Sequence, residues 1–479
     1  EGAAGESYAK IDENPFLDAA RAPLSTFAVD VDTASYSNTR RFLSEGRLPP
    51  RDAVRVEELV NYFTYDYPQP ADAAPFSVTA EVADCPWNPA HRLVHIGLQG
   101  RKVARENLPP ANLVFLVDVS GSMGAPDKLP LVKSSLLRLA EQLRPGDRVA
   151  VVTYAGSSGV ALDSTPGARA GDIAAAVARL EAGGSTNGGS GIRLAYRVAE
   201  ENFIRGGVNR VILATDGDFN VGVTSDEELV RLIEEKRRGG VFLSVLGFGT
   251  GNLNDSMMEK LADKGNGNYA YIDTEAEAER ALVEQAAGTL ATIARDVKIQ
   301  VEFNPRLVAG YRLVGYENRL LAVRDFNDDR KDAGEVGAGH SVTALYEVVP
   351  AGQRVENPGV DELKYSRPVE VARGAGGGEL LTVKLRYKEP DGDASRPLNV
   401  GVPDRLASYR NASENFRFAA AVAEFGMLLR DSRYKGQSSY DGAAELARAA
   451  LGADLRGHRA EFVRLVETAK GISLDGAGR

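Results

Sequence analysis

Five oxygen-bearing side chains stand in three short segments whose order and spacing suit a divalent metal site. Asp118, Ser120 and Ser122 lie together in the first segment, and two later segments supply Thr186 and Asp216. Hydroxyls and carboxylates are hard oxygen donors, the type that Mg²⁺ prefers while it keeps several of its waters. If the three hydroxyls bind the ion directly and the two aspartates bind it through water, little negative charge reaches the metal. We therefore expect the ion to stay electrophilic and to capture a carboxylate from outside at an open position.

The three segments together resemble the metal-ion-dependent adhesion site of von Willebrand factor type A domains. That pattern has D-x-S-x-S, then a threonine, then an aspartate commonly followed by glycine. The matching stretches here are 118–122, 183–187 and 215–217, and all five metal-site positions agree. The resemblance implies Mg²⁺ as the ion, with Mn²⁺ or Ca²⁺ as alternatives, and a protein ligand that offers Asp or Glu to it.

Alternating strand and helix patterns surround these segments and predict a doubly wound, mostly parallel sheet. Apolar runs predict strands at 113–117, 148–154, 211–214, 241–248 and 268–272. Apolar residues at helical spacing predict helices over 132–143, 173–180, 192–203, 227–236 and 275–294. Because ligand loops in such folds lie at the carboxyl ends of strands, the metal-site residues are expected at one edge of the sheet. The fold class is therefore α/β, with a von Willebrand factor type A-like module over 110–292.

Further domains are expected on both sides of this module, since 479 residues exceed what one hydrophobic core usually organises. Short alternating strands over 76–109 and 293–400 predict one β-sandwich into which the module is inserted, which requires the ends of the module to lie close together. Helical patterns predict an N-terminal helical region over 14–75 and a C-terminal helical region over 401–479. The polar start, 1–13, suits a flexible tether.

The flanking regions resemble a bacterial family of von Willebrand factor type A proteins, in the stretches 14–68, 427–432 and 460–466. Many members of that family are exported or lipid-anchored. The resemblance implies the bacterial cell envelope, periplasmic or surface-exposed, with a lipid anchor on an N-terminal segment removed before Glu1; a cytoplasmic location stays open. No apolar stretch approaches the roughly 20 residues that span a bilayer.

Composition and the sparse Cys and His residues argue against several function classes. The formal charge of -10 lacks the basic footprint of a nucleic-acid-binding protein. Cys85 is the single cysteine, so it forms no internal disulfide and no Cys-based zinc site, and it is expected to be a packed loop residue. His91 and His95 lie in a segment that alternates like a strand, which disfavours the metal-facing pair they would form on a helix.

Two catalytic alternatives fail on their spacing. The stretch 27–35 superficially resembles the D-x-D-x-T loop of haloacid-dehalogenase phosphatases, but Thr33 follows Asp32 directly and Ala34 stands where the hydroxyl is needed. We expect Asp32, Thr33 or Ser35 to cap a helix that runs to about residue 45. A hydrolase elbow, G-x-S-x-G, is also absent, since an aspartate stands where its first glycine would be. The acidic loop 325–339 is expected to be a solvated hairpin rather than a calcium loop.

The sequence thus predicts a non-enzymatic protein that uses Mg²⁺ to hold an acidic side chain of a protein partner. Two hypotheses from other classes stay open. One is a co-factor subunit or adaptor for a ring ATPase, which type A domains of chelatase-like systems resemble. The other is a structural envelope protein in which the metal only stabilises the module.

Overall fold

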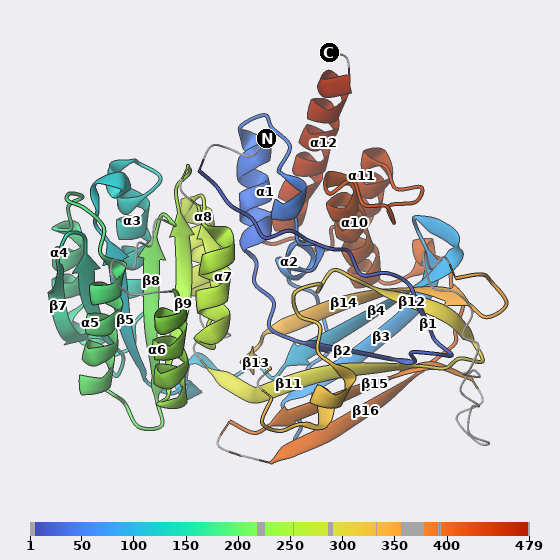
Figure 1. Cartoon of the computed structure of the whole chain (residues 1–479), viewed down its shortest axis with the longest axis horizontal. Coiled ribbons are helices and arrows are strands. Elements are labelled where there is room, and N and C mark those ends of the chain that lie inside the picture. Colours follow the sequence, from blue (N-terminus) through green and yellow to red (C-terminus); the bar gives the residue numbers. More distant parts are fainter. Residues whose placement is uncertain are drawn as a thin grey trace. The chain divides into compact units, whose positions relative to one another are not determined.

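The computed structural model describes residues 5–217, 226–251, 253–285, 291–331, 333–355, 378–390, 392 and 394–477. The chain forms two compact units. The first comprises residues 1–9, 32–38 and 102–292, and the second comprises residues 10–31, 39–101 and 293–479. The predicted fold class is confirmed, because the first unit holds a mostly parallel sheet between helices and the second holds antiparallel sheets and the C-terminal helices (Figure 1).

The first unit is built on a six-stranded sheet with the order β10-β9-β8-β5-β6-β7. Its strands are β5 (Ala111–Asp118), β6 (Arg148–Tyr154), β7 (Ser158–Pro166), β8 (Val208–Thr215), β9 (Val241–Phe248) and β10 (Tyr269–Ile272). Its helices are α3 (Leu129–Ala140), α4 (Ala170–Ala178), α5 (Gly188–Glu201), α6 (Asp226–Arg238), α7 (Asp255–Lys264) and α8 (Glu275–Glu279). All neighbouring strands are parallel except β7, which pairs antiparallel with β6.

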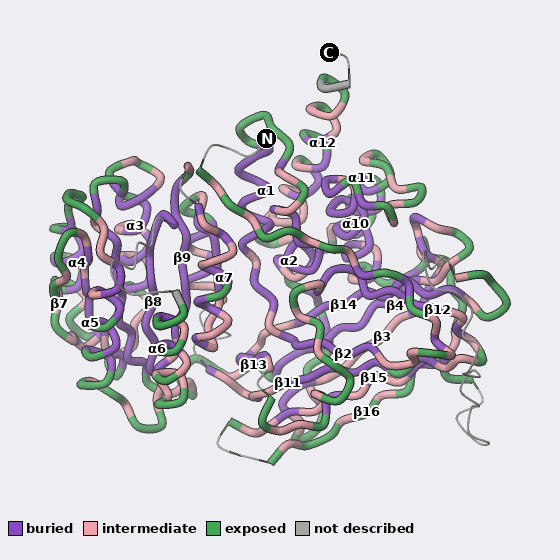
Figure 2. Tube along the Cα trace, viewed as in Figure 1, coloured by how far each residue is buried: buried purple, intermediate pink, exposed green. Residues whose placement is uncertain are grey.

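Each central strand is buried on both faces, as a parallel sheet covered by helices requires. Along β5, Val114 and Leu116 pack into the core with residues of α5, α6 and α7. The alternate residues Leu113, Phe115 and Val117 pack into the opposite core with residues of α3, α4 and α8. Figure 2 shows β8 and β9 buried along their length. The continuous apolar runs in the sequence follow from this double coverage, because successive side chains of a strand point to opposite faces.

Three elements of the first unit differ from the sequence prediction. Strand β7 was not predicted, because this edge strand has one buried residue and lacks an apolar pattern. Helix α7 was not predicted either. The predicted helix over 275–294 is wrong at its end: α8 continues as a π-helical segment, Arg280–Glu284, and a strand of the second unit, β11, begins at Thr292. Residues 286–290 of that prediction lie outside the described residues.

The second unit contains two antiparallel sheets. One has the order β1-β12-β14-β4-β3, and the other has the order β13-β11-β15-β16 with β2 paired to β11. The strands are β1 (Leu17–Asp18), β2 (Leu24–Ala28), β3 (Phe76–Cys85), β4 (Asn88–Gly100), β11 (Thr292–Phe303), β12 (Val308–Val314), β13 (Gly334–Gly337), β14 (Ser341–Pro350), β15 (Glu379–Lys388) and β16 (Ser395–Pro403). Residues of both sheets, such as Ile96 and Val383, share one apolar core, so the two sheets form a sandwich.

The N-terminal part of the chain is less helical than predicted. Helices α1 (Ala34–Ser44) and α2 (Val56–Asn61) fall within 14–75, but the same stretch also supplies β1 and β2 to the sandwich. Within 1–13, the segment predicted as a flexible tether, the amide of Ser7 donates a 3.0 Å hydrogen bond to the carbonyl of Leu253. Residues 1–4 lie outside the described part of the chain. Pairing partners about 250 to 290 residues away along the chain decide these segments, and a local pattern does not reveal them.

The C-terminal region is helical, with α10 (Glu414–Leu429), α11 (Tyr440–Arg448) and α12 (His458–Ala477). Phe418 and Phe425 of α10 make edge contacts with Phe462 of α12, at ring distances of 5.5 and 5.3 Å. The apolar side chains of α10 therefore pack in the core of the C-terminal region. Among the described residues, no helix is both long enough and apolar enough to cross a membrane.

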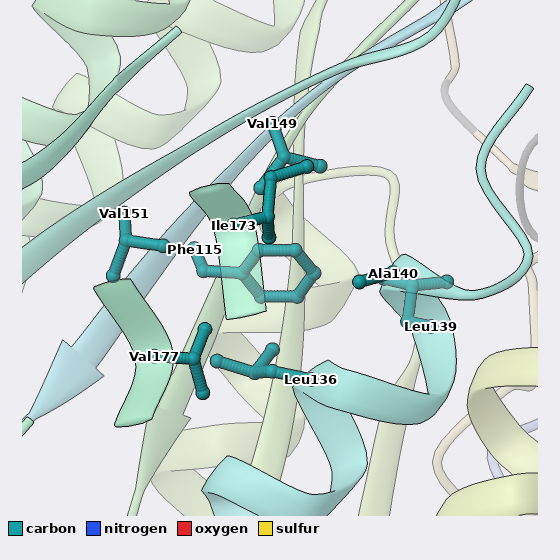
Figure 3. A pocket seen from close by; sticks show the side chains of 8 residues that line it. All are labelled: Phe115, Leu136, Leu139, Ala140, Val149, Val151, Ile173 and Val177. Atoms are coloured by element: carbon teal, nitrogen blue, oxygen red, sulfur yellow. The ribbon is translucent and has the colours of Figure 1, made fainter. Parts of the chain in front are cut away.

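A small cavity lies between the sheet of the first unit and helices α3 and α4 (Figure 3). Its lining is formed entirely by apolar side chains: Phe115, Leu136, Leu139, Ala140, Val149, Val151, Ile173 and Val177. An apolar cavity without polar partners offers no ligand to an ion and no hydrogen bond to water. We therefore assign it to imperfect core packing and place the candidate site elsewhere, at the ends of the strands.

Candidate metal centre

The fold brings the predicted site segments to one edge of the sheet. Strand β5 ends at Asp118, which pairs in register with Tyr154 at the end of β6. Strand β8 pairs with β5 on the other side and ends at Thr215, one residue before Asp216. Because these three strands are parallel, their carboxyl ends meet at the same edge, where ligand sites of open α/β sheets lie.

Two backbone hydrogen bonds hold the loop that carries Thr186 against the loop that carries the serines. The amide of Gly183 donates to the carbonyl of Val119 at 2.7 Å, and the amide of Gly121 donates to the carbonyl of Gly184 at 3.0 Å. Gly184 has a φ of +84°, a conformation that favours glycine, and it stands two residues before Thr186. The second predicted segment, 183–187, therefore lies beside the first, as a three-loop site requires.

The side chains of the first loop are arranged for a common ion. The Oγ atoms of Ser120 and Ser122 lie 3.1 Å apart, and Oδ1 of Asp118 accepts a 2.8 Å hydrogen bond from the amide of Ser120. Asp118, Ser120 and Asp216 are buried, whereas Ser122 and residues 183–185 are exposed. The carboxylates thus lie at the bottom of the site, and solvent or a ligand reaches it past the hydroxyl of Ser122.

The donor set fits Mg²⁺. Two neighbouring ligands of an octahedral ion bound at its usual distance of about 2.0–2.1 Å lie about 2.9 Å apart, close to the separation of the two serine hydroxyls. Hydroxyls and carboxylates are the oxygen donors that such an ion takes, and the exposed side leaves room for its waters. When bound, the ion would supply a Lewis-acidic centre, while Ser120, Ser122 and Thr186 would hold it and Asp118 and Asp216 would balance its charge.

The buried carboxylates also shape the electrostatics of the site. Burial raises the pKa of Asp118, and the neighbouring charge of Asp216 adds to that effect, while hydrogen bonds from Ser120 and Tyr154 oppose it. The hydroxyl of Tyr154 donates to Oδ2 of Asp118 at 3.1 Å, and burial raises the pKa of this phenol well above its ordinary value. Tyr154 is therefore a permanent donor that keeps one oxygen of Asp118 in place.

Sequence reasoning missed two residues of this centre, Tyr154 and Lys128. Tyr154 could have been found, because it ends the strand that follows Asp118 in a predicted parallel sheet. Lys128 immediately precedes α3, and its Nζ lies 2.9 Å from Oδ2 of Asp216. A lone lysine in a turn gives no sequence signal, so this ion pair emerges from the fold alone.

The residues of the rejected phosphatase pattern make structural contacts within the first unit. Oδ1 of Asp32 accepts a hydrogen bond from the amide of Tyr269 at 2.7 Å, and the hydroxyl of Thr33 accepts one from Arg280 at 2.8 Å. The helix predicted after them is α1, which begins at Ala34 and ends at Ser44. The Asp32 carboxylate therefore anchors β10 rather than standing free as a nucleophile.

The other candidates lie in the second unit and are packed or paired there. His91 and His95 lie on strand β4 as expected; His91 contacts the carboxylate of Glu347 at 2.6 Å, and burial lowers the pKa of His95 to about 3. Cys85 is buried, which raises the pKa of its thiol well above the ordinary value. In the acidic loop, Asp328 pairs with Arg330 at 3.0 Å. Pairing of His91 and Asp328, and burial of His95 and Cys85, indicate structural roles for these four candidates.

Family comparisons match nearly the whole chain in three segments. A profile described as von Willebrand factor matches residues 3–95, the von Willebrand factor type A domain profile matches residues 112–285, and a profile described as uncharacterized protein YfbK, C-terminal, matches residues 288–472. YfbK of Escherichia coli K12 is 45% identical over 473 residues, which cover 97% of this chain and 81% of that protein.

More distant proteins are also similar to parts of this chain. The inter-alpha-trypsin inhibitor heavy chain H3 of Pongo abelii is 27% identical over 51% of this chain and 30% of its own length. A solved von Willebrand factor type A protein from Catenulispora acidiphila is 17% identical and covers 84% of this chain and 91% of its own, with a TM-score of 0.45. The ArnB paralog VWA2 from Sulfolobus acidocaldarius is 16% identical, with 83% and 98% covered and a TM-score of 0.38.

Proposed function

Because this chain belongs to the YfbK family of von Willebrand factor type A domain proteins, we propose that it is a non-enzymatic protein-binding module that works through a metal ion. Ser120, Ser122 and Thr186 hold Mg²⁺, and Asp118 and Asp216 assist through water. The exposed position of the ion then takes the carboxylate of an Asp or Glu side chain on a protein partner.

One observation carries this proposal: three loops at one sheet edge gather hydroxyls and carboxylates, and the carboxylates are buried whereas the residue Ser122 is exposed. Buried carboxylates hold positive charge in a low-dielectric setting, whereas neutral hydroxyl ligands leave the ion short of negative charge. An ion held in this way binds an external carboxylate strongly. The site also lies on loops of a rigid sheet, where binding residues are commonly found.

Two steps test the proposal. Titration calorimetry first measures Mg²⁺ and Mn²⁺ binding to wild type and to the double variant Ser120→Ala, Ser122→Ala. The immobilised proteins then capture partners from an envelope extract of the source organism, in Mg²⁺ and in EDTA. Ser185→Ala is the matched control, because Ser185 is an exposed serine of the same loops that has no place in the proposed ligand set.

The outcomes separate the three functional hypotheses. A partner held by wild type and Ser185→Ala in Mg²⁺, but lost in EDTA and by the double variant, supports metal-mediated binding. A ring ATPase as that partner would favour the adaptor role. If wild type binds metal yet holds the same proteins in all conditions, the metal has a structural role; if wild type binds no metal, the proposal fails.

The place of action is also a proposal. Family resemblance in the flanking regions supports the bacterial cell envelope. Fractionation of the source organism, followed by protease accessibility of the native protein in intact and permeabilised cells, tests this. Recovery in the cytoplasm alone would contradict it.

A further inference from the structure

A buried ion pair lies inside the candidate metal centre. The Nζ of Lys128 is 2.9 Å from Oδ2 of Asp216, and the two residues are 7% and 1% exposed. The carboxylates of a metal site are ordinarily expected to have no cationic side chain beside them. Here the ammonium group of Lys128 is paired with one of the two carboxylates.

The fold makes specific room for this lysine. Gly249 directly follows β9 and has a φ of +71°. A Cβ atom at that position would lie 2.4 Å from both Cγ and Cε of Lys128. The absence of a side chain at Gly249 therefore leaves the room that the aliphatic part of Lys128 occupies when its ammonium contacts Asp216.

The ion pair changes the charge balance of the site. In their ionised forms Asp118 and Asp216 together carry two negative charges, and the ammonium group of Lys128 offsets one of them. A divalent ion would then leave the loaded centre with one excess positive charge. Without Lys128 the same centre would be neutral. Since the groups are buried, these charges are weakly screened and act strongly on each other.

We propose that Lys128 weakens the hold of the site on its metal and thereby strengthens the hold of the loaded site on a carboxylate ligand. The lysine repels the divalent ion and competes with it for Asp216. In return it keeps the loaded centre positive, so an arriving acidic side chain meets net attraction. This inference rests on the proposed metal-mediated function and assigns Lys128 the role of setting ligand preference.

Substitution of Lys128 tests the first part of the proposal, that this lysine weakens metal binding. Lys128→Gln keeps a hydrogen-bond donor for Asp216 but removes the charge, and Lys128→Met removes both. We expect the Kd for Mn²⁺, measured by titration calorimetry, to fall at least about tenfold in Lys128→Gln. Lys133→Gln is the control, because Lys133 lies on α3 but donates to the carbonyls of Ala178 and Leu180. Its Kd should match that of wild type.

The second half needs a carboxylate probe. Trifluoroacetate added to the Mn²⁺-loaded protein is followed by ¹⁹F relaxation, which the paramagnetic ion enhances when the carboxylate binds it. We expect several-fold weaker enhancement at matched Mn²⁺ occupancy in Lys128→Gln than in wild type or Lys133→Gln. Equal enhancement, or an unchanged or higher Kd for Mn²⁺, would overturn the inference while leaving the proposed metal site standing.

The stability of the variants must also be measured, because loss of the ion pair leaves the carboxylate of Asp216 buried without its positively charged partner. If metal-free Lys128→Gln is too unstable for calorimetry, the Mn²⁺-induced rise in Tm replaces it and should exceed that of wild type in both Lys128 variants. A rise equal to or smaller than that of wild type overturns the inference. Absence of Mn²⁺ binding in wild type and all variants would sink the proposed function together with it.

Discussion

The hydroxyl of Tyr154 donates a hydrogen bond of 3.1 Å to Oδ2 of Asp118, across two strand ends that pair in register. Oδ1 of the same carboxylate accepts the amide of Ser120, so both oxygens of Asp118 are oriented by the fold. A carboxylate oriented in this way can serve an ion without rearranging. Partners that orient a metal-binding group are commonly worth 10–100-fold in metal affinity.

Removal of that hydroxyl should weaken metal binding and barely change the fold. In Tyr154→Phe we expect the Kd for Mn²⁺ to rise about tenfold, with a loss of about 1 kcal/mol in the free energy of unfolding. Titration calorimetry and denaturant unfolding measure the two quantities. Tyr196→Phe is the matched control, because the buried hydroxyl of Tyr196 has no hydrogen-bond partner in the described part of the chain. Equal Kd values for the two variants would show that Tyr154 does not orient the site.

Substitution of the serines should affect metal and partner together. In Ser120→Ala and in Ser122→Ala, one of two hydroxyls that lie 3.1 Å apart is lost. We expect each variant to bind Mn²⁺ at least about tenfold more weakly and to lose partner capture in proportion, while the far-ultraviolet circular dichroism stays that of wild type. Normal metal affinity in either variant would remove that serine from the ligand set, and Ser185→Ala should behave as wild type.

Metal removal should destabilise the first unit selectively. A ligand present at about 100 times its Kd stabilises the folded state by about 2.7 kcal/mol, so EDTA should lower the temperature at which the first unit unfolds. Trp87, the single tryptophan of the sequence, lies in the second unit, and its fluorescence follows the unfolding of that unit. We expect EDTA to lower the temperature of one unfolding transition seen by calorimetry, that of the first unit. The unfolding temperature reported by Trp87 fluorescence should stay unchanged. A shift of the Trp87 transition alone would contradict this assignment.

The second unit should lose stability as pH rises, because of Glu57. Burial raises the pKa of Glu57 from 4.5 to about 8, and the charges of Glu317 and Glu58 add to this shift. The folded state therefore holds a proton that the unfolded state releases, and the stabilisation present below about pH 4.5 is lost progressively up to about pH 8.

Glu57→Gln should flatten this dependence and stabilise the second unit at pH 8 by an amount on the order of a few kcal/mol. Denaturant unfolding followed by Trp87 fluorescence from pH 5 to 8.5 measures the change. Glu424 also makes the free energy of unfolding depend on pH, in wild type and in Glu57→Gln alike, since burial raises the pKa of Glu424 to about 7. Glu445→Gln replaces an exposed glutamate of α11 and should leave the wild-type slope unchanged. A slope in Glu57→Gln as steep as that of wild type would refute the prediction.

Local patterns were sufficient for the central domain because its elements are long, regular and buried. The predicted runs within β5 (113–117) and β8 (211–214) are apolar throughout, and Ser244 is the one polar side chain in β9, as a sheet covered on both faces demands. The order of strands and helices then predicts that Asp118 and Asp216 lie at one edge of the sheet. Where burial is partial the patterns fail: β7 has one buried residue, Thr165, and was not predicted.

The sequence by itself determined the fold class, the family resemblance and the three loops that carry the candidate ligands, since these depend on residue type and short-range spacing. Tertiary structure alone decided the contacts that tune the site. Lys128 meets Asp216 across 88 residues, and the stretch that carries β2 pairs with β11 across more than 260. Such pairings depend on which strands become neighbours and on the room left by residues such as Gly249. No local pattern encodes them, because the side chains involved become neighbours only after the sheets have formed.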